Sequence, residues 1–76
     1  MNSGVVKPST LRKALRALGG QERHEGGESI IRFRGTTIIV GRCPFSRVML
    51  HRVERKLAAA GITSEEFSCA LQGTLQ

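Results

Sequence analysis

Leucines recur at helical spacing near the start of the chain. Leu11, Leu15 and Leu18 stand at i, i+4 and i+7, so all three lie on one face of a helix. Ser9 precedes this run and is the predicted N-cap, because its side chain can accept hydrogen bonds from the first turn. Gly19 follows the last leucine, and glycine tolerates the left-handed conformation that ends many helices. The pattern predicts one short amphipathic helix between these two residues.

The hydrophobic period then changes from helical to extended. Three extended segments are separated by glycine-containing turns, and they cover residues 21–25, 29–34 and 36–40. In the second segment Ile31 and Phe33 point to one face, whereas Arg32 and Arg34 point to the other. The third segment is a run of β-branched residues, which suits a strand. These features predict a three-stranded antiparallel meander with one half-buried face.

A second helix is predicted to begin after Ser46. This serine is the N-cap, and Phe45 precedes it at the position from which a hydrophobic residue packs against Leu50. The buried stripe of the helix is expected to be Leu50, Val53, Leu57 and Ala60. Gly61 ends the helix.

Residues 62–67 carry the clearest local signal in the chain. Thr63 and Glu66 have the spacing of a capping box, and Ile62 and Phe67 have the spacing of the hydrophobic contact that accompanies it. The third helix that follows is expected to be short and to reach about Leu71. We expect residues 1–7 to be loose and the tail from residue 73 to be frayed.

The order of these segments predicts an α+β fold of the α-β-β-β-α type with a short C-terminal helix. A chain of 76 residues suits one compact domain, expected to span residues 1–76 with an ordered core at about 9–71. Because there is only one small sheet, both main helices are expected to cover the same face. Arg32 and Arg34 would then lie on the face that is open to solvent.

The composition adds a strong positive charge. Twelve Lys and Arg stand against six Glu and no Asp, which gives a formal net charge of +6 and a pI near 10.8. This excess fits nucleic acid or another acidic surface, although it also fits a basic surface that serves only solubility. Glu22, Glu25 and Glu28 are interpreted as a solvated acidic edge rather than a paired-carboxylate site.

Several kinds of site are not indicated by the sequence. Cys43 and Cys69 form no motif with each other or with His24 and His51, so no disulfide framework and no metal site are predicted. No cofactor is expected. No apolar run is long enough for a signal peptide or a membrane span, so we expect a cytoplasmic protein with no membrane partner.

The basic residues form two candidate nucleic-acid surfaces. The first joins the two main helices and comprises Arg12, Lys13, Arg16, His51, Arg52, Arg55 and Lys56. The second joins the sheet to the start of the second helix and comprises Arg32, Arg34, Arg42 and Arg47. Domains that bind double-stranded RNA contact phosphates through a helix start and a basic loop, which favours Arg42 and Arg47. The lack of an aromatic platform argues against recognition of single strands by base stacking.

Two strings resemble a known family. Residues 57–67 read Leu-Ala-Ala-Ala-Gly-Ile-Thr-Ser-Glu-Glu-Phe, and residues 11–19 supply an opening helix of similar pattern. With the element order, they resemble the HicA toxins of toxin-antitoxin systems, which are mRNA interferases with a fold similar to the double-stranded-RNA-binding domain. The resemblance covers about residues 9–67. It implies that fold, a structured or double-stranded RNA partner, and an antitoxin-like protein partner, in a toxin-antitoxin or mobile-element setting.

The chain departs from this family at the residue on which catalysis depends. Where the family has Gly-Ser-X-His, this chain has Gly26-Gly27-Glu28-Ser29. The family's imidazole handles protons, whereas a serine hydroxyl keeps its proton unless another base removes it. Glu28 could act as a base but repels phosphate, and His24 could reach the substrate but is interpreted first as a solvated side chain. No catalytic residue is therefore assigned.

Three functions remain open at this point. The leading hypothesis is a HicA-like RNA-binding protein whose ribonuclease activity is weakened or lost. The alternative is a phage- or plasmid-encoded inhibitor or adaptor that reuses the fold to dock on a protein or nucleoprotein complex. The third is a ribonuclease that uses Glu28 or His24. The RNA target and the oligomeric state are left open by the sequence.

Overall fold

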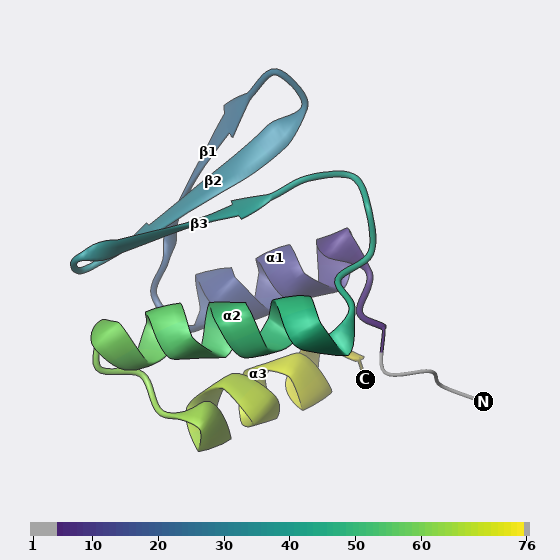
Figure 1. The fold of residues 1–76 in the computed structure, drawn as a ribbon. Coiled ribbons are helices and arrows are strands. Elements are labelled where there is room, and N and C mark those ends of the chain that lie inside the picture. The colour runs from purple at the N-terminus through teal and green to yellow at the C-terminus, as the bar shows by residue number, and fades with distance from the viewer. Residues whose placement is uncertain (1–4, 76) are drawn as a thin grey trace.

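The order of helices and strands is the predicted one. The computed structural model describes residues 5–75, with side chains described to residue 73. The elements are α1 (Pro8–Ala17), β1 (Gln21–Glu25), β2 (Glu28–Phe33), β3 (Thr36–Val40), α2 (Arg47–Ala59) and α3 (Ser64–Leu75) (Figure 1). The α+β class and the α-β-β-β-α order are therefore confirmed. None of the described helices is long and apolar enough to cross a membrane.

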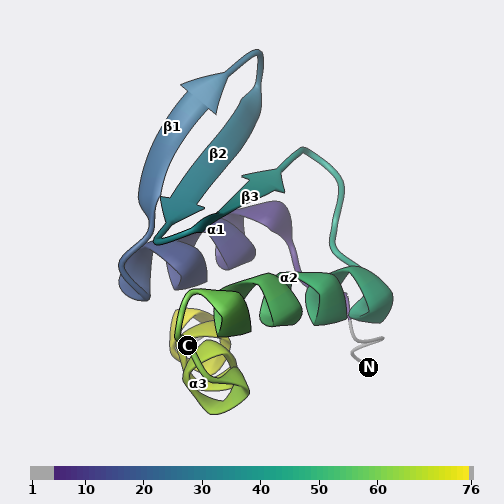
Figure 2. The same ribbon diagram turned by 60° about the vertical axis from the view of Figure 1, so that its left-hand side comes forward.

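The three strands form one antiparallel sheet in the order β1-β2-β3. Its register pairs Ser29 with His24 on one side and with Val40 on the other. Residues paired in this way point to the same face, so the register decides which side chains meet the helices. Figures 1 and 2 show all three helices on one side of the sheet, as predicted for the two main ones. The third helix packs chiefly against α1 and α2.

The hydrophobic core lies between the helices and two of the three strands. Its buried members are Leu11, Leu15, Ile31, Ile38, Val40, Phe45, Val53, Leu57 and Phe67. The strands β2 and β3 supply Ile31, Ile38 and Val40, whereas the described core contains no residue of β1. The strand β1 is therefore held by its ladder with β2 and by polar contacts.

Both predicted caps in the second half of the chain are present. The Oγ of Ser46 accepts a hydrogen bond of 3.4 Å from the backbone N–H of Met49. The Thr63 N–H donates to the Glu66 carboxylate at 2.9 Å, and the Glu66 N–H donates to Thr63 Oγ1 at 3.1 Å. This reciprocal pair is a capping box, and it holds the start of α3 where Phe67 enters the core.

Three local predictions are wrong at the ends of elements. The first helix begins at Pro8 with Lys7 at its N-cap, because proline suits the first helical position, so Ser9 is inside the helix. The third helix continues through Gly73 to Leu75. Residues before α1 are not all loose, since Val6 and Phe45 exchange two backbone hydrogen bonds of 3.0 and 2.8 Å. Residues 1–4 and 76 lie outside the described residues.

The open face of the sheet carries Arg32 as predicted, but Arg34 is not in the strand. The strand β2 ends at Phe33, and Arg34 is an exposed residue of the turn into β3. Gly35, with a φ of 79°, allows this turn to close. Ile39 also faces solvent on this side.

We predict that Thr63→Ala lowers the free energy of unfolding by about 1 kcal/mol, because it removes the Oγ1 that accepts the hydrogen bond from the Glu66 N–H. Ser64→Ala, one residue further on, is the matched control and should change stability by less than about 0.5 kcal/mol. Urea unfolding followed by circular dichroism measures both. Equal midpoints for the two variants would show that the cap contributes nothing.

Candidate nucleic-acid interface

A cationic hollow of about 380 Å³ lies where α1 begins beside the ends of β2 and β3. Three cations line it, namely Lys7, Arg12 and Arg42. Ser29, the residue that stands at the family's histidine position, lines it as well. The hollow thus gathers side chains from α1, β2 and the loop after β3, which are distant in the sequence. We call it the phosphate hollow.

The side chain of Arg12 is held by contacts with two strands of the sheet. Its Nη1 donates a 3.3 Å hydrogen bond to Ser29 Oγ and lies 3.7 Å from Glu22 Oε2. Ser29 is only 3% exposed, because it faces the helices from β2. From the sequence, Arg12 was expected to share a basic helical surface with Lys13. The structure places it at the boundary between helix and sheet.

Arg42 lies against the backbone of the turn between β1 and β2. A Cβ added at Gly27 would stand 2.7 Å from Arg42 Nη2, so a glycine leaves the room that this guanidinium occupies. Gly27 also has a φ of 85°, which L-residues rarely adopt. Gly26 and Gly27 were predicted to form the turn between the first two strands. Gly27 also leaves space for the Arg42 guanidinium.

The start of α1 adds a partial positive charge to the same hollow. Pro8 and Ser9 line it, no side chain of the described residues caps the helix, and no acidic residue stands in the first turn. The first backbone N–H groups of a helix have no intrahelical partner, and the helix dipole favours an anion there. Together with three cations, this end of the helix makes a favourable position for a phosphate group.

Glu22 of β1 connects the sheet to α1 through two arginines. Its burial was not predicted from the sequence. It was interpreted as a solvated acidic edge, yet its side chain is only 11% exposed. Its carboxylate lies 3.6 Å from Arg16 Nη1 as well as 3.7 Å from Arg12 Nη1. The buried Oε2 accepts no hydrogen bond, so these charges are what compensate its burial. The strand is polar throughout, so the sequence offers no signal for this burial, and the pairing of Glu22 with the buried Ile31 reveals it.

His24 lies closer to Ser29 than the sequence suggested. Its Nδ1 is 3.4 Å from Ser29 Oγ, and its Nε2 is 3.5 Å from Glu22 Oε2. The ring is 67% exposed, so solvent or a ligand can reach it. Glu28, the other candidate base, alternates to the opposite face of β2 and is exposed. Of the two candidates, only the imidazole adjoins Ser29.

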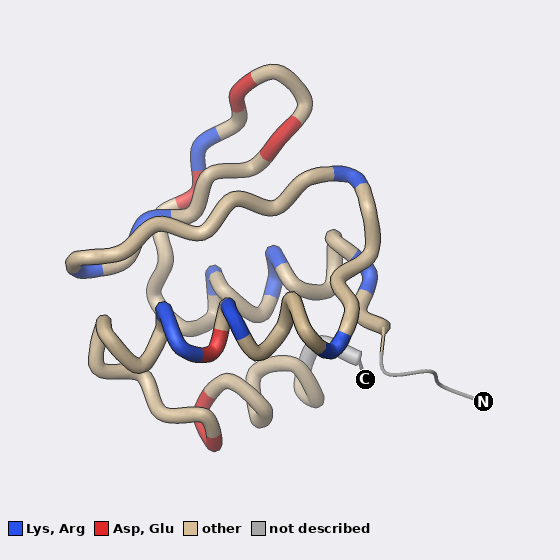
Figure 3. The backbone as a smooth tube through the Cα atoms, in the orientation of Figure 1, with Lys and Arg blue, Asp and Glu red and all other residues tan. Residues whose placement is uncertain are grey.

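The two predicted basic surfaces are divided by the fold. The cations of the second helix do not join Arg12 and Arg16, because Arg52 and Lys56 line a separate hollow beside β3. Lys13 and Arg55 are simply exposed. Figure 3 shows the basic positions spread over α1, α2, the sheet and the loops, whereas acidic positions lie in the hairpin of β1 and β2, on α2 and at the start of α3.

The second predicted surface is divided as well. Arg32 and Arg34 share a shallow hollow with Phe33. Arg47 and His51 line a hollow between α2 and α3, and His51 Nδ1 lies 3.7 Å from Oε1 of Glu54 on the same helix α2. Only Arg42 of this group reaches the phosphate hollow. Lys7, which the sequence analysis did not select, completes it.

The described residues contain neither a metal-binding cluster nor a disulfide. No group of three or more His, Cys, Asp or Glu there could hold a metal ion. Cys43 and Cys69 are both free and exposed.

Comparison with models of known families, with curated proteins and with solved structures finds no match to this chain.

We predict that Arg12 and Glu22 are energetically coupled by about 1 kcal/mol or more, because Glu22 is largely buried. A double-mutant cycle with Arg12→Ala and Glu22→Gln, measured by urea unfolding, gives this coupling.

The matched pair is Arg23 and Glu25, which are closer at 2.6 Å but have exposed side chains. Their coupling should stay below about 0.5 kcal/mol, because water screens an exposed pair. A larger coupling for the exposed pair would show that burial is not what gives Glu22 its role.

Proposed function

We propose that this protein binds structured RNA by seating a backbone phosphate in the phosphate hollow. The observation that carries the proposal is the convergence of Lys7, Arg12 and Arg42 on the uncapped start of α1. Phosphate contacts supply most of the affinity of proteins for nucleic acids, and they are made by such cations and by helix N-termini. The net charge of +6 supports the same class of partner.

Double-stranded RNA fits this surface better than single strands. The phosphate hollow contains no aromatic side chain on which a base could stack. Duplex RNA is recognised mainly through its phosphates and 2′-hydroxyls, which need donors rather than a stacking platform. The guanidinium groups of Arg12 and Arg42, which line the hollow, are donors of that kind. The resemblance to HicA toxins points to the same ligand.

On this proposal the protein is a HicA-like RNA binder of a toxin-antitoxin or mobile-element system, working in the cytoplasm, where exposed thiols such as Cys43 and Cys69 stay reduced. Its ribonuclease activity is weakened or lost. Ser29 supports this, because the family's imidazole is replaced by a hydroxyl that is buried and accepts a hydrogen bond from Arg12.

We predict that Arg42→Ala weakens binding to a short RNA duplex about tenfold at low salt. The slope of log affinity against log salt concentration should become shallower by about one, which corresponds to the loss of one phosphate contact. Arg55→Ala removes the same charge from the exposed face of α2 and should have a much smaller effect. Fluorescence anisotropy over a salt series measures both, after thermal unfolding has shown that both variants are folded. Equal losses of RNA affinity in the two variants would show that binding depends on net charge alone and not on the phosphate hollow.

A second candidate is slow RNA cleavage by His24, and one contact favours it. The exposed imidazole stands 3.4 Å from the hydroxyl at the family's catalytic position, so a ligand phosphate in the hollow would be near it. A general base must stand within hydrogen-bond reach of the proton that it removes, and an imidazole suits the task. Arg12 and Lys7 would stabilise the negative charge that develops.

We expect no turnover above background for the wild-type protein with labelled duplex and hairpin RNA at neutral pH. Should slow cleavage occur, it should fall at least about a hundredfold in His24→Ala and be unchanged in Glu28→Gln. The cleavage assay is read on denaturing gels, with RNA binding checked in parallel. Cleavage that persists in His24→Ala would exclude the imidazole.

A further inference from the structure

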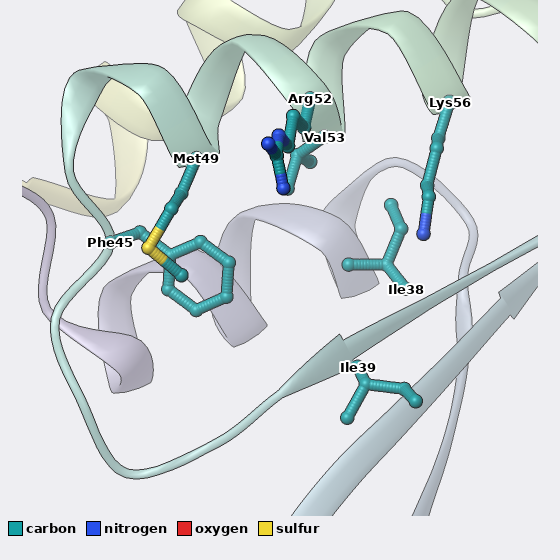
Figure 4. A pocket seen from close by; sticks show the side chains of 7 residues that line it. All are labelled: Ile38, Ile39, Phe45, Met49, Arg52, Val53 and Lys56. Atoms are coloured by element: carbon teal, nitrogen blue, oxygen red, sulfur yellow. The ribbon is translucent and has the colours of Figure 1, made fainter.

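A second hollow, of about 180 Å³, lies between β3 and α2 and has a different chemistry (Figure 4). Five apolar residues line it: Ile38, Ile39, Phe45, Met49 and Val53. Figure 4 shows the Phe45 ring and the Met49 side chain together at one end, below α2. It shares no lining residue with the phosphate hollow. We call it the apolar hollow.

The apolar hollow reaches around the edge of β3. Ile38 points toward the helices and is buried, whereas its neighbour Ile39 points to the open face and is 54% exposed. Since adjacent residues of a strand face opposite sides, a hollow that touches both must lie at the strand's edge. Met49, 40% exposed, continues the apolar surface onto α2.

The edge of β3 is unprotected in a way that the edge of β1 is not. The sheet order leaves β3 with a partner strand on one side only within the described chain. Its residues are Thr-Thr-Ile-Ile-Val, with no charge and no proline, whereas β1 reads Gln-Glu-Arg-His-Glu. Edge strands are normally blunted by charges, and a bare one is a template for another extended segment.

Two cations border the apolar hollow. Arg52 and Lys56 stand one helical turn apart on α2, and Figure 4 shows both side chains extending from α2 toward β3. Neither forms an ion pair within the described part of the chain, and the nearby Glu54 lies against His51 instead. Two unpaired cations beside an apolar floor are complementary to carboxylates that flank an apolar side chain.

We propose that an extended acidic segment of another protein adds to the free edge of β3. Its backbone would extend the sheet, one aliphatic or aromatic side chain would enter the apolar hollow, and flanking carboxylates would meet Arg52 and Lys56. Apolar anchors in pockets dominate such interfaces, while the backbone ladder gives affinity without sequence preference. A second copy of this chain is the poorer occupant, because it would bring a like-charged α2 to the same edge.

The test is selection from a random library of short displayed peptides on the folded protein, followed by anisotropy with the best synthetic peptide. The selected peptides should share acidic residues around one aliphatic or aromatic residue. Amide shifts on binding should map to β3 and the start of α2. Arg52→Glu and Met49→Ala should each weaken the peptide about tenfold or more.

Matched controls separate this site from net charge and from general hydrophobicity. Arg55→Glu makes the same charge change as Arg52→Glu, and Val48→Ala removes an apolar side chain that is 65% exposed next to Met49. Both should leave the peptide's affinity unchanged, as should Arg42→Ala in the phosphate hollow. The loss of RNA binding in Arg42→Ala therefore tests the other proposal alone.

Four outcomes would overturn the inference. One is selection without a shared acidic motif, and another is equal loss of affinity in Arg55→Glu and Arg52→Glu. The third is a dimer in analytical ultracentrifugation that Ile39→Glu dissociates, which would assign this edge to a second copy. The fourth is RNA, rather than peptide, shifting the amides of β3.

Discussion

A shortage of apolar surface at β1 shapes much of this molecule. The core is filled by side chains of the helices and of β2 and β3, and β1 presents Glu22 and His24 to the helices in place of apolar residues. Burying a carboxylate there is unfavourable unless cations compensate it, and α1 supplies Arg12 and Arg16. Because Arg12 is drawn inward for this purpose, it also reaches Ser29 and the phosphate hollow. The ion pair that compensates the burial of Glu22 thus also positions Arg12 in the candidate site.

The sequence predicted the elements well because their signals are local. The capping box at Thr63, the cap at Ser46 and the alternation around Ile31 each depend on neighbours in the chain, and the structure contains all three. The errors at helix ends have local causes too. A proline at the first helical position moves the cap of α1 to Lys7, and α3 runs on through Gly73.

The candidate site could be predicted only in part, because its grouping depends on how elements meet. Periodicity places Arg12 on a polar arc but does not say that this arc faces β1. Glu22 looked solvated because β1 is polar throughout, and only the register with Ile31 shows that it points to the helices. Lys7 was passed over because it precedes the helix, although that position is what brings it to the hollow. Rotation of a helix against a sheet is a tertiary property that no short pattern records.

The two hollows differ in chemistry but are joined by one loop. The segment between β3 and α2 contributes Arg42 to the phosphate hollow and Phe45 to the apolar hollow. The backbone bridge from Phe45 to Val6 connects the same loop to Lys7, which also lines the phosphate hollow. A partner that contacts Phe45 would therefore restrict the backbone that carries Lys7 and Arg42, two of the cations of the phosphate hollow. Any such coupling must be reciprocal, so RNA in one hollow would alter affinity at the other by the same factor. If both proposals hold, the fold supplies a physical route by which a protein partner at the apolar hollow alters RNA binding at the phosphate hollow without covering it.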